Sequence, residues 1–196
     1  MTLIAQRRAL RAGLLVFLVG SAGLVACGPD PFAPVATDSN VDVSIEVWAL
    51  TGAPTSFPTV HLVAQRITAR PDAAASFDLA FDIDADGRLR VMPVNQVVTP
   101  LSGNRRIGII RSSEVYNTIV EAPRDGWIFD STLAVNVGQV FIVRVQTQYC
   151  ASSTSPEVYA KYMVDSIFPV ERRIRLSGRV NPNCGFRSFL SGVPAF

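Results

Sequence analysis

Apolar and polar residues alternate with a period of two in several separate segments of this 196-residue chain. In residues 41–47 the valines and the isoleucine occupy the odd positions, and the polar residues occupy the even ones. The same alternation recurs in residues 76–83, 141–146, 158–165 and 173–177. Alternation of this kind is typical of antiparallel strands with one buried face. The chain is therefore predicted to be mostly sheet.

Turn-forming residues separate these segments, at residues 84–87, 102–104, 125–126, 136–138 and 182–183. Roughly eight to ten short strands in one domain predict an all-β antiparallel sandwich, with the general architecture of immunoglobulin domains. A small closed β-barrel is the alternative. Residues 59–70 fit a helical stripe about as well as a strand, and we assign them to a strand. Residues 113–121 have helical spacing, with Pro123 behind them, and predict one short helix.

The first 26 residues have the layout of an export signal. Arg7, Arg8 and Arg11 form a basic start, residues 12–26 carry no charge, and small residues lead to Cys27. This order is that of a secretory signal peptide, and the uncharged stretch is shorter than the roughly 20 residues of a membrane span. The Arg7-Arg8 pair alone is a weak indication of twin-arginine export.

Leu24-Val25-Ala26-Cys27 resembles the lipobox of bacterial lipoprotein precursors. The resemblance covers residues 1–27 and implies cleavage before Cys27, a diacylglycerol on its thiol and acylation, for example by palmitate, of its amino group. Several acyl chains hold a protein firmly at a membrane, whereas one chain holds it marginally. An ordinary signal peptide cut elsewhere is the alternative. Gly28 is not the aspartate that commonly retains lipoproteins at the inner membrane, so we expect the outer membrane if the host has one.

Residues 27–40 contain three prolines and little that packs, and we interpret them as a lipidated cysteine followed by a flexible tether. Residues 41–196 then form a single domain. The signal holds 3 of the 18 basic residues and none of the 16 acidic ones, which leaves 15 against 16. Such a balance argues against a nucleic-acid partner.

Cys150 and Cys184 are the two cysteines that lipidation does not use. Disulfides persist in the oxidising space to which an exported chain passes, so we predict a Cys150–Cys184 bridge. Position parity puts Cys150 on the polar face of its strand, and we therefore expect the bridge near the surface. Two cysteines and the single His61 cannot supply a zinc shell of four ligands.

Asp82, Asp84 and Asp86, followed by Gly87, match the opening of a calcium-binding loop. The position that should supply a bidentate glutamate is Pro93, which departs from that pattern. A hairpin turn without a bound ion is the preferred interpretation of these residues, and the two are compatible. No other cofactor is indicated.

Three further features have ordinary structural interpretations. His61 lies in a strand, and no nucleophile motif accompanies it. Arg173, Arg175 and Arg179 share one strand face, which could meet anionic glycans or headgroups but more often is a solvated face. Several aromatic residues could line a sugar-binding face, although core packing is the commoner use: Trp48, Trp127, Tyr149, Tyr159 and Tyr162.

Taken together, these features predict a lipid-anchored protein of the cell envelope. A non-enzymatic adhesion or assembly module is the first interpretation of its role, with a protein or glycan partner in the envelope. A small-ligand-binding lipoprotein, with calcium or a carbohydrate as the ligand, is the alternative. The first predicts no deep polar pocket, whereas the second predicts a concave site with convergent polar groups.

Overall fold

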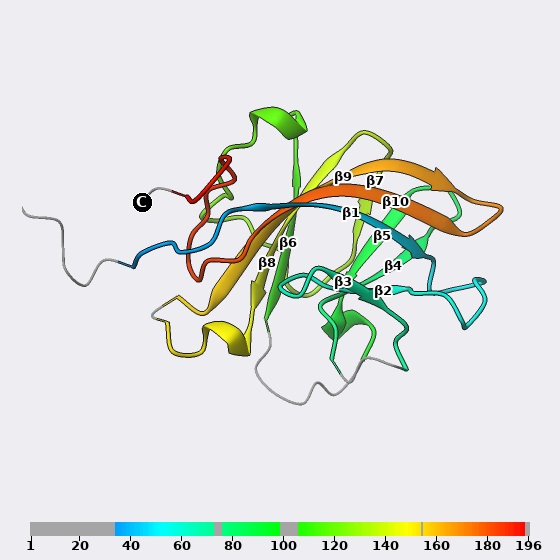
Figure 1. Ribbon diagram of the computed structural model, residues 1–196. Coiled ribbons are helices and arrows are strands. Elements are labelled where there is room, and N and C mark those ends of the chain that lie inside the picture. The colour runs from blue at the N-terminus through cyan, green and yellow to red at the C-terminus, as the bar shows by residue number, and fades with distance from the viewer. Residues whose placement is uncertain (1–33, 73–75, 99–105, 154, 195–196) are drawn as a thin grey trace, which may run out of the picture. The chain divides into compact units, whose positions relative to one another are not determined.

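The computed structural model describes residues 34–72, 76–98, 106–153 and 155–194. Over these residues the chain forms two antiparallel sheets of five strands each (Figure 1). The sheets are not closed into a barrel, so the predicted β-sandwich is confirmed and the alternative of a barrel is wrong. Within the described ranges, no helix has the length and hydropathy needed to cross a membrane.

The strands follow one another in each sheet in a fixed spatial order. The first sheet contains, from edge to edge, β1 (Val41–Trp48), β10 (Arg173–Asn181), β9 (Glu157–Phe168), β8 (Val140–Gln146) and β6 (Ile107–Ser112). The second contains β3 (Ile67–Ala69), β2 (Val60–Leu62), β4 (Leu79–Ile83), β5 (Leu89–Pro93) and β7 (Leu133–Val135). Three single 3-10 turns accompany them: η1 (Val94–Gln96), η2 (Tyr116–Thr118) and η3 (Gln148–Cys150).

The main core lies where the predicted alternation places it. In β1, Ile45 and Val47 are buried while Asp42 and Ser44 are exposed. Each apolar side chain that is fully buried stabilises the fold by about 1.5–3 kcal/mol relative to exposure. The largest fully buried side chains come from both sheets: Tyr162, Phe81, Phe141, Leu79, Leu89, Ile109, Ile174 and Leu176.

Two strands of the first sheet depart from the expected half-burial. In β8 and β9, runs of consecutive residues are buried on both faces of the sheet. A second apolar cluster explains this, because parts of residues 116–128 and 186–190 pack on the outer face of this sheet. We call these two segments the outer cover. The buried residues of this second cluster come from the outer cover and from the strands beneath it: Ile119, Ala122, Val140, Ile142, Tyr159 and Phe189.

Lys161 of β9 is the clearest consequence of the outer cover. The alternation predicts it on a solvated face, but its side chain is only 3% exposed. Its Nζ donates hydrogen bonds to the backbone oxygens of Tyr116 (2.7 Å) and Ile119 (2.8 Å), and it lies 4.2 Å from the ring centroid of Tyr116. Burial lowers the pKa of Lys161, and the Asp42 carboxylate partly opposes this shift.

Both ambiguous segments turn out to be less regular than predicted. Of the short helix expected at residues 113–121, only the 3-10 turn η2 forms, because Val115 and Ile119 on either side of it are extended. Residues 59–70 contain the strands β2 and β3, which form a hairpin instead of one continuous strand. The predicted turn at residues 102–104 lies outside the described residues.

A disulfide joins Cys150 and Cys184, with their Cα atoms 5.5 Å apart. The two cysteines follow β8 and β10, which flank β9 at the same end of the first sheet. The pairing agrees with the sequence prediction, but the expected position near the surface is wrong for Cys150, which is fully buried. The 3-10 turn η3 interrupts the strand parity after Thr147 and so directs Cys150 into the core.

Candidate ligand-binding cleft

The β2–β3 hairpin ends in an unusual residue. Its loop spans residues 63–66, and the Arg66 N–H donates to the Val63 carbonyl oxygen at 3.1 Å. Arg66 has φ of 61°, a left-handed conformation that normally falls to glycine or asparagine. The Asp78 carboxylate fixes the start of the loop by accepting the Val63 N–H at 2.6 Å. The sequence thus places a long cationic side chain at a position where the left-handed backbone favours glycine.

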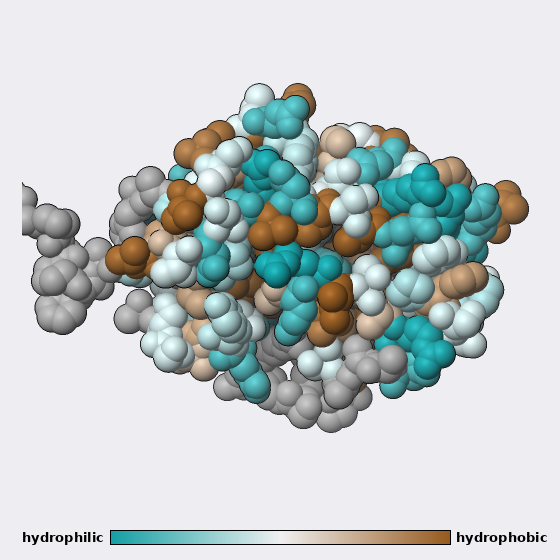
Figure 2. Space-filling model, viewed as in Figure 1, coloured by the Kyte–Doolittle hydropathy of each residue, from teal (hydrophilic) through white to brown (hydrophobic). Residues whose placement is uncertain are grey.

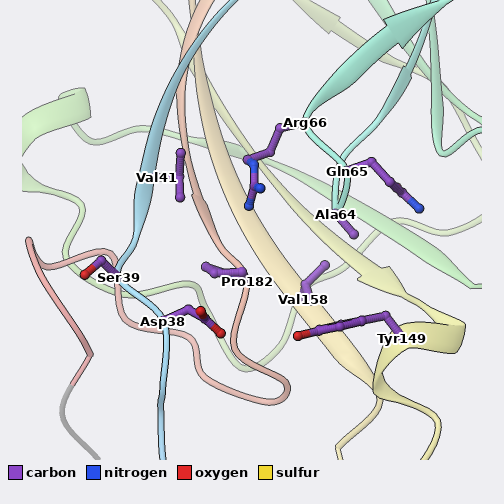
Figure 3. A pocket seen from close by; sticks show the side chains of 9 residues that line it. All are labelled: Asp38, Ser39, Val41, Ala64, Gln65, Arg66, Tyr149, Val158 and Pro182. Atoms are coloured by element: carbon purple, nitrogen blue, oxygen red, sulfur yellow. The ribbon is translucent and has the colours of Figure 1, made fainter.

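This loop forms one wall of a cleft of about 390 Å³ (Figure 3). The cleft lies between the hairpin, the chain entering β1, the η3 turn and the first part of β9. Arg66, Asp38 and Tyr149 enter it from three of these segments. The lining residues are Asp38, Ser39, Val41, Ala64, Gln65, Arg66, Tyr149, Val158 and Pro182.

Asn183 holds the chain that approaches β1. Its Oδ1 accepts the backbone N–H groups of Thr37 (2.8 Å) and Asp38 (3.0 Å), and its Nδ2 donates to the Asp38 carbonyl oxygen at 2.8 Å. Asn183 is itself buried, one residue before the disulfide-bonded Cys184. Residues 37–40, which the sequence assigned to the tether, are therefore fixed on the domain at one side of the cleft.

Arg66, Asp38 and Tyr149 are exposed to solvent, and their charged or polar ends have few partners within the part of the chain that the structure describes. There the guanidinium of Arg66 and the hydroxyl of Tyr149 have no hydrogen-bond or ion-pair partner, and Tyr149 is 70% exposed. Asp38 accepts a hydrogen bond from the Thr37 hydroxyl at 3.0 Å but forms no ion pair there. Arg66 and Asp38 thus line the same cleft without neutralising each other.

Arg172 shows that left-handed backbone can have a purely structural reason. Its φ is 54°, and its guanidinium donates to the carbonyl oxygen of Thr51 at 2.9 Å and to the Asp82 carboxylate at 2.6 Å. These bonds join the β9–β10 hairpin to the second sheet and stabilise the strained conformation. The left-handed backbone of Arg66 follows from its place at the end of the four-residue β2–β3 loop, but no comparable bonds hold its side chain among the described residues.

The three aspartates of the calcium motif point to different partners. Asp82 is buried and pairs with Arg172, whereas the Asp84 carboxylate accepts the N–H groups of Asp86 and Arg88 in a tight turn. Asp84 and Asp86 also pair with the Arg88 guanidinium, each at 2.8 Å. Burial would raise the pKa of Asp84, but the hydrogen bonds from Arg88 outweigh it and lower the pKa. Among the described residues, no group of three His, Cys, Asp or Glu is arranged to hold a metal ion.

Replacing Asp84 and Asp86 together by asparagine is therefore expected to leave the melting temperature equally insensitive to calcium and to chelator. The Arg88 side chain is 43% exposed, and ion pairs near the surface contribute about 0–1 kcal/mol; asparagine can still accept the N–H groups of the turn, so the variant should also lose little stability. Thermal denaturation in calcium and in chelator measures both. A bound ion at 100 times its dissociation constant would stabilise by about 2.7 kcal/mol, and a shift of that size, lost in the variant, would contradict this expectation.

The arginine stripe of β10 is neutralised by two carboxylates of β1 together with Glu171, which pairs with Arg173 at 2.6 Å. Arg173 and Arg175 both pair with Glu46, at 2.9 and 2.6 Å, and Arg179 forms two hydrogen bonds to Asp42, at 2.6 and 2.8 Å. Hydrogen bonds from these arginines lower the pKa values of Glu46 and Asp42 below their usual range. The stripe is thus a ladder of ion pairs across an edge strand and does not present free positive charge.

The remaining sequence candidates do not converge on the cleft. His61 is fully buried between the sheets, where its Nε2 lies 2.8 Å from the Tyr162 hydroxyl. Trp48 stacks on Phe57, and Trp127 packs against Tyr159. Of the five aromatic candidates, Tyr149 is the one that lines the cleft. Cys27 lies outside the described residues.

Sequence reasoning missed Arg66, Asp38 and Asn183. Asp38 carried no signal because it lies in a segment interpreted as tether, and Asn183 was interpreted only as a turn residue. Arg66 had almost no signal, because residues 63–66 contain no residue typical of a turn. The hairpin, and the left-handed position in its loop, were therefore not predicted. The chain matches no known protein family, no curated protein and no solved structure.

Proposed function

We propose that the protein is a lipid-anchored, non-enzymatic protein of the cell envelope whose β-sandwich holds a small ligand in the cleft beside Arg66. The export signal and the lipobox resemblance of residues 1–27 support the compartment and the anchor. The cleft supports the ligand, and it favours the second of the two roles predicted from the sequence. No nucleic-acid partner is expected, because the part of the chain after the signal is nearly neutral.

The convergence of unpartnered polar groups in one concave site is the observation that carries the proposal. Ligand sites usually occupy about 300–1,000 Å³ and combine apolar walls with a few placed polar groups. The cleft has that size, with Val41 and Pro182 as apolar wall and Arg66 and Tyr149 as polar groups.

The outer surface gives less support to a broad adhesion face. On the described part of the face that Figure 2 shows, hydrophobic and hydrophilic residues are interspersed and do not form one continuous apolar area. The arginine stripe, the strongest charged feature predicted from the sequence, is neutralised by Glu46, Asp42 and Glu171. Adhesion through a large apolar or basic face is therefore the less favoured role.

A binding screen with a matched pair of variants tests the role of the cleft. Saturation-transfer NMR with mixtures of free sugars and of amino acids should show at least one binder, and Tyr149→Ala should weaken its binding at least tenfold. Val170→Ala serves as control, because Val170 is 98% exposed and does not line the cleft. If Tyr149→Ala and Val170→Ala bind every compound as the unaltered protein does, the cleft is not the site.

Lipidation at Cys27 is tested at the residue itself. Cys27→Ser should abolish anchoring and leave an uncleaved or soluble product, because the thiol is the proposed site of acylation. Mass spectrometry of the N-terminal peptide is expected to show a diacylglycerol and an acyl chain on Cys27 in the unaltered protein. An unmodified N-terminus at another residue would exclude the anchor.

In a host with two membranes, fractionation is expected to find the protein in the outer one.

A further inference from the structure

Arg66 and Asp38 bring opposite charges into one cleft and leave them apart. We propose, on the basis of the proposed ligand-binding function, that the cleft selects a small zwitterion. Its anionic group is bound by the Arg66 guanidinium, and its ammonium group is bound by the Asp38 carboxylate beside the Tyr149 ring. The ligand would bring the two counter-charges that the described part of the chain does not supply to these residues.

Arg66 is one of several arginines, with Arg90 and Arg124, for which the described residues provide no ion pair, but it is the one that shares a cleft with a carboxylate. The arginines of β10 are all bonded to acidic residues of neighbouring segments, and Arg172 is bonded to Asp82. Arg66 is long enough to reach across a loop, yet no ion pair joins it to Asp38, although both line the cleft. An arginine fork matches carboxylate and phosphate oxygens with two parallel hydrogen bonds, so its free end is suited to either anion.

The opposite end of the site is held in place by the fold. Asn183 binds the backbone of Asp38 on both sides, and the Thr37 hydroxyl donates to one oxygen of its carboxylate. The Tyr149 hydroxyl points into the cleft from the facing side in Figure 3. A carboxylate together with an exposed aromatic ring attracts an ammonium group, by charge and by cation–π interaction.

The walls indicate the size and character of the ligand. Val41 and Pro182 offer an apolar surface in the cleft, and the volume of about 390 Å³ suits a molecule from amino-acid to dipeptide size. A free amino acid or dipeptide carries the required charges, and so does the phosphoethanolamine headgroup of a lipid. The shared chemistry is an ammonium group and an anionic group on one small body, and the experiment separates the two sources.

Calorimetry on the purified product of the full chain, expressed in an exporting bacterium, tests the charge requirement. The probes are L-phenylalanine, N-acetyl-L-phenylalanine, L-phenylalanine amide and O-phosphoethanolamine. Removing either charge from phenylalanine should weaken binding at least tenfold. Tighter binding of O-phosphoethanolamine than of phenylalanine would assign the site to a headgroup, and the reverse order to an amino acid or peptide; both orders support the zwitterion.

Arg66→Gly separates binding from folding. Glycine adopts the φ of 61° without strain, so this variant should melt at an equal or higher temperature than the unaltered protein. It should nevertheless bind the zwitterion at least tenfold more weakly. Asp38→Asn should weaken binding of phenylalanine but not of its N-acetyl form, which lacks the ammonium group. Arg124→Ala is the control, because Arg124 is exposed and outside the cleft.

Three outcomes would overturn the inference in distinguishable ways. If a neutral sugar binds in a Tyr149-dependent manner while no zwitterion binds, the zwitterion is wrong and the proposed function stands. If no probe and no compound of the broader screen binds, both fail. Binding of phenylalanine that is unchanged in Arg66→Gly also overturns the inference, since the anion would then lie elsewhere.

Discussion

Loss of the Cys150–Cys184 disulfide is expected to lower the free energy of unfolding by about 3–4 kcal/mol without abolishing the fold. The bond closes a loop with a sequence separation of 34, which restricts the unfolded chain. It also fixes η3 and the segment after β10, at the end of the sheet where Tyr149 and Asn183 lie. The main core between the two sheets does not depend on it, so a folded domain should persist.

The measurement is urea denaturation of the oxidised protein and of the variant that combines Cys150→Ala with Cys184→Ala. The variant keeps the buried site apolar, so the difference in stability reports the covalent link more than a packing defect. Thiol titration of the unfolded, unreduced protein from an oxidising compartment should find neither thiol free. Two reactive thiols per chain, or equal stability of the two proteins, would contradict the prediction.

Acidification is expected to destabilise the protein through His61 alone by about 3 kcal/mol between pH 6.5 and pH 4. Burial lowers the pKa of His61 to about 4, although the hydrogen bond to the Ile67 carbonyl oxygen (2.8 Å) opposes the shift. Because Nδ1 faces a carbonyl oxygen, it carries the proton of the neutral ring, and Nε2 accepts from Tyr162. In this pH range the unfolded chain takes up a proton that the folded chain rejects, so stability falls as the pH falls.

The single histidine makes this prediction directly measurable. Its ring resonances in an NMR titration belong to one residue, and they should show no protonation of the folded protein above about pH 5. His61→Gln removes the titration while keeping a donor and an acceptor. Its stability should therefore depend less on pH between 6.5 and 4, even if its absolute stability is lower. A midpoint near 6.5 in the folded state would rule out the effect.

Local pattern in the sequence was sufficient to predict the layered fold. Alternation in residues 41–47 places Ile45 and Val47 in the core, and the structure places them there. The pairing of Cys150 with Cys184 followed from the elimination of Cys27. The burial of Lys161 could not be predicted in this way, because it depends on Tyr116 and Ile119, which lie more than 40 residues away in the chain. An alternation with a period of two predicts the face of the strand on which a residue lies, but not which distant segment covers that face.

The cleft could not be predicted from local sequence patterns either, because distant segments of the chain form it. Asp38, Arg66 and Tyr149 belong to segments with no sequence relation, and only the register of the strands between them brings these segments together. The hairpin itself was hidden, since residues 63–66 contain none of the glycine, proline or asparagine that usually mark a turn. A residue that violates local preference, such as Arg66, is recognised only once the backbone is known.

Lys161 is the only lysine in the sequence, and its ammonium group is enclosed beneath the outer cover. An amine-directed acylating reagent added to the folded protein therefore meets no exposed lysine side chain. The reagent reaches Nζ only when the backbone around Tyr116 and Ile119 moves away, so the rate of acylation follows the frequency of that local opening. A mass increase at this one residue would time the detachment of the outer cover without any engineered label.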